Sequence, residues 1–575
     1  MGLAEQDGGS SDPSLKSLGE GLLRRLLTVR KVKFNGSARL WRDRVLTPST
    51  LPGLLLLTAV SALSGTGILL VLNSESLLVQ NQSYSTLLAA VFVAVLIAYR
   101  ITQQRVISRA SAAVEEALHG WRTGIAEKVV RLSLRDTEEL SRGRLLDGLA
   151  KHYEQLSQTI VPLVAGLEAL ILLCFMLAYL FTLSALAGLL TVTVAGFLVL
   201  GYLNTERAMK EEMRAAGLAD AQLTRLAEEM TDGFKELRLD HQKRFALQHD
   251  IAQASQTVAS HRTKTAVMLS QLITTGNSAS YLLAGAVVFV LPVLIGSNGD
   301  QIQRIITAVL FLLGPISGVV GAVQQLAIAQ FCLRAIEGFE QEVDTLLEPE
   351  NVLEEPLHSF SIIRLVEMHY SHCHREDEAG FSVAGLNLSL KRGQIVFLTG
   401  ANGSGKTTAL RLLTGLYPAD SGRIEIDGRP LPAVPAQGYR NLFAAVFADG
   451  HVFRKPYGLD AGGMARLQEA TRLLGIRQKL PADLASGYDA ETLSTGQRKR
   501  LALALAIAED RPVLVLDEWA ADQDPATRAR FYNELLPMLK ASGKTVIAVT
   551  HDDRYFGCAD VRYYMEEGRM QRVES

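Results

Sequence analysis

Residues 393–413 read GQIVFLTGANGSGKTTALRLL. An apolar run, Ile395–Leu398, leads into a glycine-rich turn and then into apolar residues at helical spacing, so the stretch predicts a β-strand, a turn and a helix. The turn fits the phosphate-binding pattern G-x-x-x-x-G-K-[ST], in which glycines let backbone N–H groups face phosphate oxygens. Lys406 would bring a positive charge to the β- and γ-phosphates, and Thr407 would offer a hydroxyl to Mg²⁺. The residues predicted to contact ATP here are Asn402, Gly403, Ser404, Gly405, Lys406, Thr407 and Thr408.

A second stretch, VLVLDEWAADQD (residues 513–524), places Asp517 and Glu518 directly after four aliphatic residues. Adjacent carboxylates at the end of a buried strand are costly unless a cation is bound beside them. In a P-loop ATPase, Asp517 would hold Mg²⁺ and Glu518 would orient and polarise the attacking water. A structural salt bridge is the alternative, but it would leave the glycine-rich loop without its metal partner.

The segment between these stretches, ETLSTGQRKRLALALA (491–506), resembles the signature of ABC proteins, Leu-Ser-Gly-Gly-Gln, with Thr495 in place of the first Gly. Other ABC motifs follow in the family's order. Tyr370 stands where these proteins stack an aromatic ring on adenine, Asp524 fits the D-loop, and His551 fits the switch histidine. The resemblance implies an ATPase whose catalytic residues are Lys406, Glu518 and His551. It also implies that ATP is held between two subunits, with the signature residues Ser494, Gly496 and Gln497 contacting the nucleotide of the partner chain.

The first half of the chain is apolar enough to form a membrane domain. Six stretches have the length of about 20 residues that a helix needs to cross a bilayer. They lie near 50–73, 86–104, 159–181, 183–204, 273–296 and 302–328. Lysines and arginines are frequent between residues 16 and 44, whereas the loop SESLLVQNQSYS has none. The positive-inside rule therefore places both termini and both long connections in the cytoplasm. Leucines at helical spacing among the N-terminal basic residues predict an amphipathic helix on the inner membrane surface.

The predicted fold is a membrane α-helical bundle of six transmembrane helices, of the exporter type, fused to a cytoplasmic α/β P-loop ABC ATPase domain. The expected segments are a cytoplasmic N-terminal segment at 1–45, the transmembrane domain at 46–335, an acidic linker at 336–355 and the nucleotide-binding domain at 356–575. With one membrane half and one nucleotide domain, the chain resembles a half-transporter that works as a homodimer in contact with membrane lipid.

Charge and cysteine spacing argue against nucleic-acid binding, a disulfide framework and a metal site. The net charge is −2, so no basic excess points to nucleic acid. The four cysteines lie far apart, and no disulfide framework is expected. The cluster His372-Cys373-His374 has no second ligand pair nearby, which favours a surface loop over a metal site.

Polar residues within the apolar stretches are the candidates for contact with a cargo. Glu168, in AGLEALILLCF, would place a carboxylate at membrane depth, which is a functional-site hypothesis by default. A hydrogen-bonded glutamate that only helps to pack the bundle is the alternative, and both interpretations stay open. Gln324 and Gln325 are milder polar positions that would face a cavity between the helices.

Three departures from the common ABC pattern narrow the resemblance. Ala448 and Asp449 stand where ABC proteins carry a glutamine that senses Mg²⁺, LASGYDAE occupies the segment before the signature, and the D-loop reads Ala-Asp-Gln-Asp. Together with LDEWAADQDP and GKTVIAVTHDDRYF, these features are similar to the bacterial cyclic-peptide and siderophore exporters, whose members include the pyoverdine-precursor and syringomycin exporters. This resemblance implies an ATP-driven exporter of the bacterial inner membrane, with ATP and Mg²⁺ as cofactors. Its implied cargo is a cyclic peptide, a lipopeptide or a peptide siderophore.

Other functions share the same motifs. A multidrug pump, a lipid or lipid-linked flippase, and a siderophore importer built on the exporter plan stay open as alternatives. A non-transporting ABC ATPase is disfavoured, because six predicted spans are joined directly to the nucleotide domain.

Overall fold

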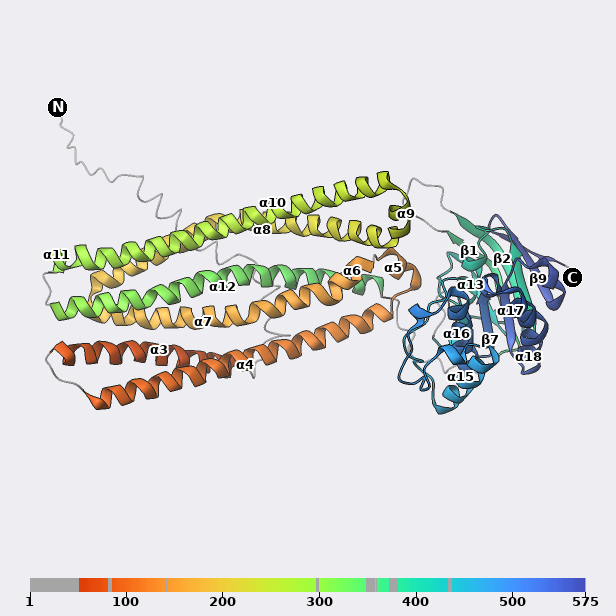
Figure 1. The fold of residues 1–575 in the computed structure, drawn as a ribbon, viewed down its shortest axis with the longest axis horizontal. Helices are drawn as coiled ribbons and strands as arrows, with labels where there is room; N and C mark the ends of the chain where they lie inside the picture. Colours follow the sequence, from red (N-terminus) through yellow and green to blue (C-terminus); the bar gives the residue numbers. More distant parts are fainter. Residues whose placement is uncertain are drawn as a thin grey trace, which may run out of the picture. The chain divides into compact units, whose positions relative to one another are not determined.

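The computed structural model describes residues 51–573, apart from 81–84, 141, 296–298, 348–356, 358, 372–380 and 433–436. The chain folds as two compact units (Figure 1). The first comprises Met1–Arg131 and Leu140–Leu346, and the second comprises Leu132–Glu139 and Leu347–Ser575. The predicted N-terminal segment 1–45, with its amphipathic helix, lies outside the described residues, as does the His372-Cys373-His374 cluster.

Long helices build the first unit. They are α3 (Leu51–Gln80), α4 (Thr86–Val130), α7 (His152–Leu183), α8 (Ala185–Asp232), α10 (His241–Gly285) and α12 (Gly299–Leu346). Shorter elements join them: α6 (Arg142–Leu146), α9 (Phe234–Leu239), α11 (Leu291–Ile295) and π-helical turns at Asp147–Lys151 and Ala286–Val290. Helix α3 packs along α4, α7 along α12, and α8 along α10, as Figure 1 shows.

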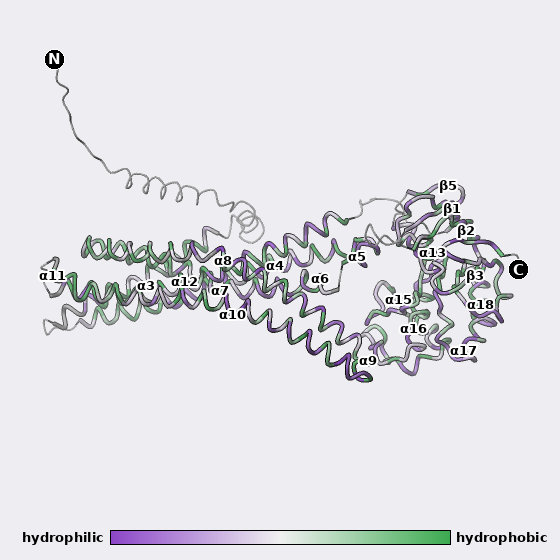
Figure 2. The backbone as a smooth tube through the Cα atoms, turned by 90° about the horizontal axis from the view of Figure 1, so that it is seen from above, coloured by the Kyte–Doolittle hydropathy of each residue, from purple (hydrophilic) through white to green (hydrophobic). Residues whose placement is uncertain are grey.

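Five helical segments among the described residues are long and apolar enough to cross a membrane. They are Pro52–Glu75, Thr86–Val130, Gly143–Leu183, His241–Val293 and Gln301–Leu346. The remaining predicted span, 183–204, falls on α8, whose apolar part, Ala185–Phe197, is shorter. Figure 2 shows apolar residues concentrated on the part of the helices toward α11 and more polar residues toward α9. The helices therefore continue well beyond their apolar parts.

Capping side chains set the breaks between consecutive helices. Ser184 is extended and ends α7, while its hydroxyl accepts a bond of 3.4 Å from the backbone N–H of Ala187 at the start of α8. Asp240 does the same for α10, accepting from the N–H of Gln242 at 2.8 Å. Helix α7 therefore ends at Leu183, and α8 begins at Ala185.

The predicted linker begins later than expected. Residues 336–346 form the last turns of α12 rather than a linker. The carboxylate of Glu340 accepts a bond of 2.7 Å from the Trp121 indole and one of 2.8 Å from Lys128. Lys128 also pairs with Asp344 at 2.7 Å. The acidic residues that suggested a solvated linker are therefore partners of α4, which explains why the helix continues.

The second unit contains two sheets. The first is antiparallel, in the order β2 (Ser382–Lys391), β1 (Ile362–Ser371), β4 (Ser421–Ile426) and β5 (Arg429–Pro430). The second runs in the order β10 (Arg569–Val573), β9 (Val561–Glu566), β3 (Ile395–Gly400), β8 (Thr545–Val549), β7 (Val513–Asp517) and β6 (Phe443–Val446). Strands β9, β3, β8, β7 and β6 are parallel, and β10 is antiparallel at the edge. The main helices are α13 (Lys406–Leu413), α15 (Ala461–Leu473), α16 (Thr495–Ala508), α17 (Pro525–Arg530) and α18 (Leu536–Ala541).

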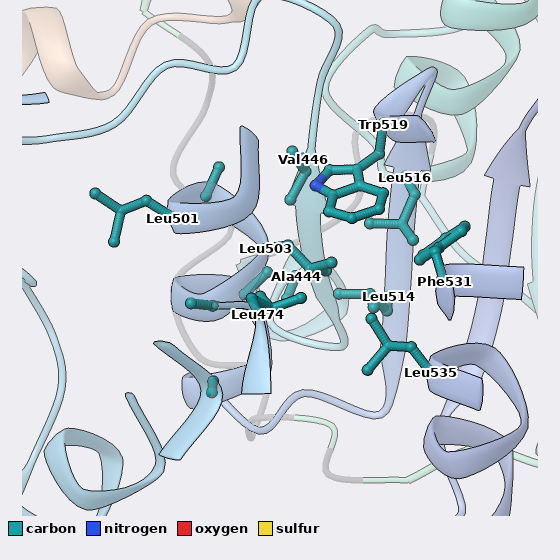
Figure 3. Close-up of a cluster of buried hydrophobic side chains, with 14 of the residues drawn as sticks. Ala444, Val446, Leu474, Leu501, Leu503, Leu514, Leu516, Trp519, Phe531 and Leu535 are labelled. Atoms are coloured by element: carbon teal, nitrogen blue, oxygen red, sulfur yellow. The ribbon is translucent and has the colours of Figure 1, made fainter. Parts of the chain in front are cut away.

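An apolar core fixes helix α16 against the parallel sheet. Every residue of β7 is buried, which accounts for the unbroken aliphatic run before Asp517. Figure 3 shows Leu514 and Leu516 of this strand beside Leu503 of α16 and the ring of Trp519. The carboxyl end of β7 and the helix that carries the signature are consequently held in one rigid packing unit.

Candidate functional site

The glycine-rich turn joins β3 to α13, as the sequence predicted. Gly400 and Gly405 have φ angles of +141° and +100°, a region that residues with a Cβ rarely adopt. A Cβ on Gly400 would lie 2.1 Å from the carbonyl oxygen of Met565, so only glycine fits there. The buried hydroxyl of Ser404 has no hydrogen-bond partner among the described residues. A buried donor without a partner at a helix N-terminus suits an anionic ligand.

Lys406 is buried inside this turn. Its ammonium donates to the carbonyl oxygens of Gly400 at 3.1 Å and Ala401 at 2.8 Å. Burial lowers the pKa of Lys406, while the nearby charges of Glu518 and Asp517 act in the opposite direction. Phosphate oxygens would supply the negative charge that stabilises the ammonium form.

The structure brings Thr407 and Asp517 together from α13 and β7. The Thr407 hydroxyl donates to Oδ2 of Asp517 at 2.8 Å, and Asp517 is 0% exposed. Burial raises the pKa of the Asp517 carboxyl, against the effect of the Thr407 bond. Its Oδ1 is buried and has no hydrogen-bond partner among the described residues. A hydroxyl beside a carboxylate with an unused oxygen has the oxygen ligands that Mg²⁺ prefers.

Glu518 and His551 also meet, from the ends of neighbouring strands β7 and β8. The two side chains approach to 3.3 Å between Oε1 and Nε2, and both are partly exposed. Glu518 has a φ of +49°, a left-handed conformation that is uncommon for a residue with a side chain. This turn directs its carboxylate away from the buried strand and toward the imidazole. Glu518 follows Asp517 directly in the chain. A carboxylate held beside an imidazole at this position can orient and polarise a water molecule.

The signature lies at the start of α16. The Ser494 hydroxyl accepts from the N–H of Gln497 at 3.3 Å, while the Gln497 side chain accepts from the N–H of Ser494 at 3.1 Å, forming a capping box. Ser494 is exposed, and Gly496 and Gln497 are partly exposed, so all three are accessible at the surface of the unit. Asp524 caps α17 through the N–H of Thr527 at 2.9 Å.

The structure does not place the Tyr370 ring where a base could stack on it. The residue is 2% exposed, and its ring stacks on Tyr417 at 4.8 Å between centroids, with the Arg135 guanidinium 5.8 Å from the ring centre. The expectation that Tyr370 binds adenine is thus corrected, because strand β1 directs this ring into the core. Phe381, immediately before β2, is instead 38% exposed, and its Cζ would lie 3.0 Å from a Cβ on Gly405. Sequence reasoning missed Phe381 because only the order of motifs was used to choose the aromatic residue.

A short helix from the first connection also belongs to the second unit. Helix α5 (Leu134–Glu139) carries Glu138, which accepts from the Tyr417 hydroxyl at 2.5 Å and pairs with Arg411 at 3.2 Å. Arg411 lies on α13, the helix that begins with Lys406. Sequence analysis did not identify these contacts, because they join residues that lie far apart in the chain.

A large apolar cavity lies within the helical unit. It has a volume of about 620 Å³ and is formed by residues of α7, α8, α10 and α12, including Phe197, Met268 and Val320. Its polar lining residues are Thr191, Thr205, Gln271, Thr275 and Gln324. Gln324 therefore lines the cavity as expected, whereas Gln325 does not.

Glu168 faces elsewhere in the bundle. Its carboxylate accepts from the Ser61 hydroxyl of α3 at 2.6 Å and from the Gln103 amide of α4 at 3.4 Å, and it is buried. These bonds direct Glu168 toward α3 and α4, and it is not among the residues that line the cavity. The alternative interpretation, a hydrogen-bonded glutamate that packs the bundle, matches this geometry.

Comparisons with known proteins agree with this geometry. The model of the ABC transporter family matches residues 383–521. The chain is similar to the ATP-binding protein SyrD of Pseudomonas syringae pv. syringae, with 30% identity over 76% of this chain and 80% of the relative. It is also 30% identical to an ATP-dependent lipid A-core flippase of Alkalilimnicola ehrlichii, over 48% of this chain and 47% of the relative. Among solved structures, it resembles a bacterial Atm1-family ABC exporter with ATP bound, with a TM-score of 0.71 and 19% identity over 91% of this chain and 95% of that one.

Proposed function

The chain belongs to the ABC transporters and has the exporter fold, and from this premise we propose that it exports a peptide natural product across the bacterial inner membrane as a homodimer. ATP hydrolysis drives members of this family, and the chain is an ATP-hydrolysing transporter. The proposal adds the cargo class, the dimer and the membrane to that assignment. Both termini lie in the cytoplasm in this proposal, following the distribution of basic residues.

The roles of the site residues follow from their positions. The backbone of the glycine-rich turn and Lys406 would bind the phosphates, and Thr407 and Asp517 would hold Mg²⁺, which would supply positive charge to the phosphates. Glu518 orients the attacking water and accepts its proton, and His551 holds the carboxylate in place. The exposed signature residues Ser494, Gly496 and Gln497 complete the site of a second copy of the chain.

The adenine needs a partner other than Tyr370. We assign the stacking contact to Phe381, because its ring is exposed and lies against Gly405 of the phosphate-binding turn. Aromatic rings stack on bases through their π-faces, so a phenylalanine ring is sufficient to hold adenine.

The observation that carries the cargo proposal is the cavity. Its walls are mainly apolar, and a few amide and hydroxyl groups project from them, which suits an amphipathic molecule with both an acyl or aliphatic part and hydrogen-bonding amides. A lipopeptide combines these features. The second candidate, a lipid or lipid-linked flippase, is favoured by the same apolar walls and differs in needing fewer amide partners.

Transport by inside-out membrane vesicles tests this proposal. ATP-dependent uptake of a fluorescent acylated cyclic peptide is expected, and Gln324→Leu should weaken it because the cavity loses an amide. Gln325→Leu is the matched control, since it changes the neighbouring residue outside the cavity lining. Uptake of a fluorescent phospholipid but not of the peptide would instead establish the flippase, and uptake confined to right-side-out vesicles would establish an importer.

A further inference from the structure

A buried lysine follows the signature on helix α16. The side chain of Lys499 is 5% exposed and lies on the face of α16 that packs toward the end of β7. Removing an ammonium group from water is costly unless charge and hydrogen bonds compensate for it. Lys499 has two such partners: its Nζ pairs with Oδ2 of Asp522 at 2.7 Å and donates to the backbone carbonyl of Glu518 at 3.0 Å.

The bond to Glu518 falls at a residue with a strained backbone conformation. Glu518 has a φ of +49°, and such left-handed conformations persist only when surrounding contacts impose them. Lys499 fixes one side of this residue through its ammonium. The backbone carbonyl of Lys499 holds the residue that follows Glu518, because it accepts a bond of 2.7 Å from the Trp519 indole. Trp519 is buried against Phe531, with 4.6 Å between ring centroids, so this second contact is anchored in the core.

The same helix holds the D-loop. Gln523 donates to the carbonyl of Gly496 at 3.1 Å and accepts from Arg500 at 3.0 Å, while Asp522 is held by Lys499. The Lys499 stem also lies against the segment after β6, since its Cγ would be 3.3 Å from a Cβ on Gly450. That segment includes Ala448, where ABC proteins carry glutamine.

We propose that Lys499 is a positioning residue for ATP hydrolysis, which holds Glu518 and the D-loop of its own chain in their working arrangement from the helix that bears the signature. This inference rests on the proposed role of Glu518 as the general base. The bond to the Glu518 carbonyl ties the ammonium to the backbone of the base itself, so the loss of this ammonium should change hydrolysis more than ATP binding.

The test measures kcat for ATP hydrolysis and the Kd for ATP separately, on the full chain in lipid nanodiscs. Lys499→Met keeps the length of the stem and removes the charge, and we expect kcat to fall at least about tenfold while the Kd for ATP changes less than about threefold. Lys499→Arg retains a charged donor and should recover part of kcat. Asp522→Asn keeps Lys499 and weakens only the ion pair, so its loss should be smaller than that of Lys499→Met.

A second lysine offers a matched control. Lys544 also bridges a carboxylate, Asp510, and a backbone carbonyl, that of Arg511 at 3.0 Å, but it precedes the amino end of β8. Lys544→Met should leave kcat near the wild-type value. Equal kcat losses in Lys499→Met and Lys544→Met, or a Lys499→Met protein with wild-type kcat, would overturn the positioning role. Glu518→Gln serves as the reference, because full activity in that variant would refute the general base itself, independently of Lys499.

Discussion

Replacing Phe381 by alanine should weaken ATP binding without unfolding the nucleotide domain. The ring is 38% exposed and lies beside Gly405, so it can offer a face to adenine. Stacking of a base on an aromatic side chain is worth about 1–3 kcal/mol by alanine substitution. With about 1.4 kcal/mol for each tenfold change, the Kd for ATP should rise roughly 5- to 150-fold.

Titration of the purified full-length protein with a fluorescent ATP analogue measures this Kd directly. Phe381→Trp keeps an aromatic face and should bind nearly as well as the wild type. Tyr370 is the comparison: Tyr370→Phe should leave the Kd unchanged, and Tyr370→Leu should lower the melting temperature, because truncating a buried aromatic side chain commonly costs a few kcal/mol of stability. An unchanged Kd in Phe381→Ala, or a folded Tyr370→Leu protein with a tenfold weaker Kd, would refute the assignment of adenine to Phe381.

Three further changes test other parts of the site and the bundle. Glu518→Gln should preserve ATP binding but lower the hydrolysis rate by roughly 10²–10⁴-fold, which a steady-state ATPase assay measures, because the general base is lost. Burial raises the pKa of Asp517, so its protonated form stabilises the metal-free chain at low pH. This stabilisation is lost as the pH rises through the pKa of Asp517 in the folded chain. Since Mg²⁺ needs the ionised carboxylate, Mg²⁺-ATP affinity should fall on acidification, and Asp517→Asn should lack this pH dependence in binding titrations. Glu168→Leu should lower the melting temperature, because Ser61 and Gln103 lose a buried hydrogen-bond acceptor, which costs about 1–3 kcal/mol. The KM for the cargo should stay unchanged. A higher KM with an unchanged melting temperature would instead assign Glu168 to cargo binding.

The meeting of the glycine-rich turn with Asp517 could be predicted from the sequence, because each motif is local. The glycine pattern before Lys406 and the aliphatic run before Asp517 each define a strand end, and parallel strands bring such ends to one edge of a sheet. Thr407 and Asp517 meet for this reason, although 110 positions separate them. The turn at Ser184 was likewise predictable, because a capping serine acts within a few residues.

The residues that the sequence assigned wrongly or left undecided are those whose role depends on which way a side chain points in the folded chain. Tyr370 occupies the right place in the order of motifs, but a one-residue change in the register of a strand moves a side chain to the opposite face, and bulges interrupt β1 around Met368. Glu168 lies on an apolar helix whose faces all look alike in sequence. Only packing against α3 and α4 decides which helices its carboxylate contacts.

Helix α5 belongs to the nucleotide-binding unit, although its neighbours along the chain, α4 and α6, belong to the helical unit. Helix α13 begins at Lys406, within the phosphate-binding turn, and Arg411 on this helix pairs with Glu138 of α5. Tyr417, which follows α13, donates to the same carboxylate and carries the stacked ring of Tyr370. The residues that precede and follow α5 lead directly into α4 and α6 of the helical unit. Glu138, in the connection between α4 and α6, is therefore bonded both to the helix that starts in the phosphate-binding turn and to the tyrosine that follows this helix.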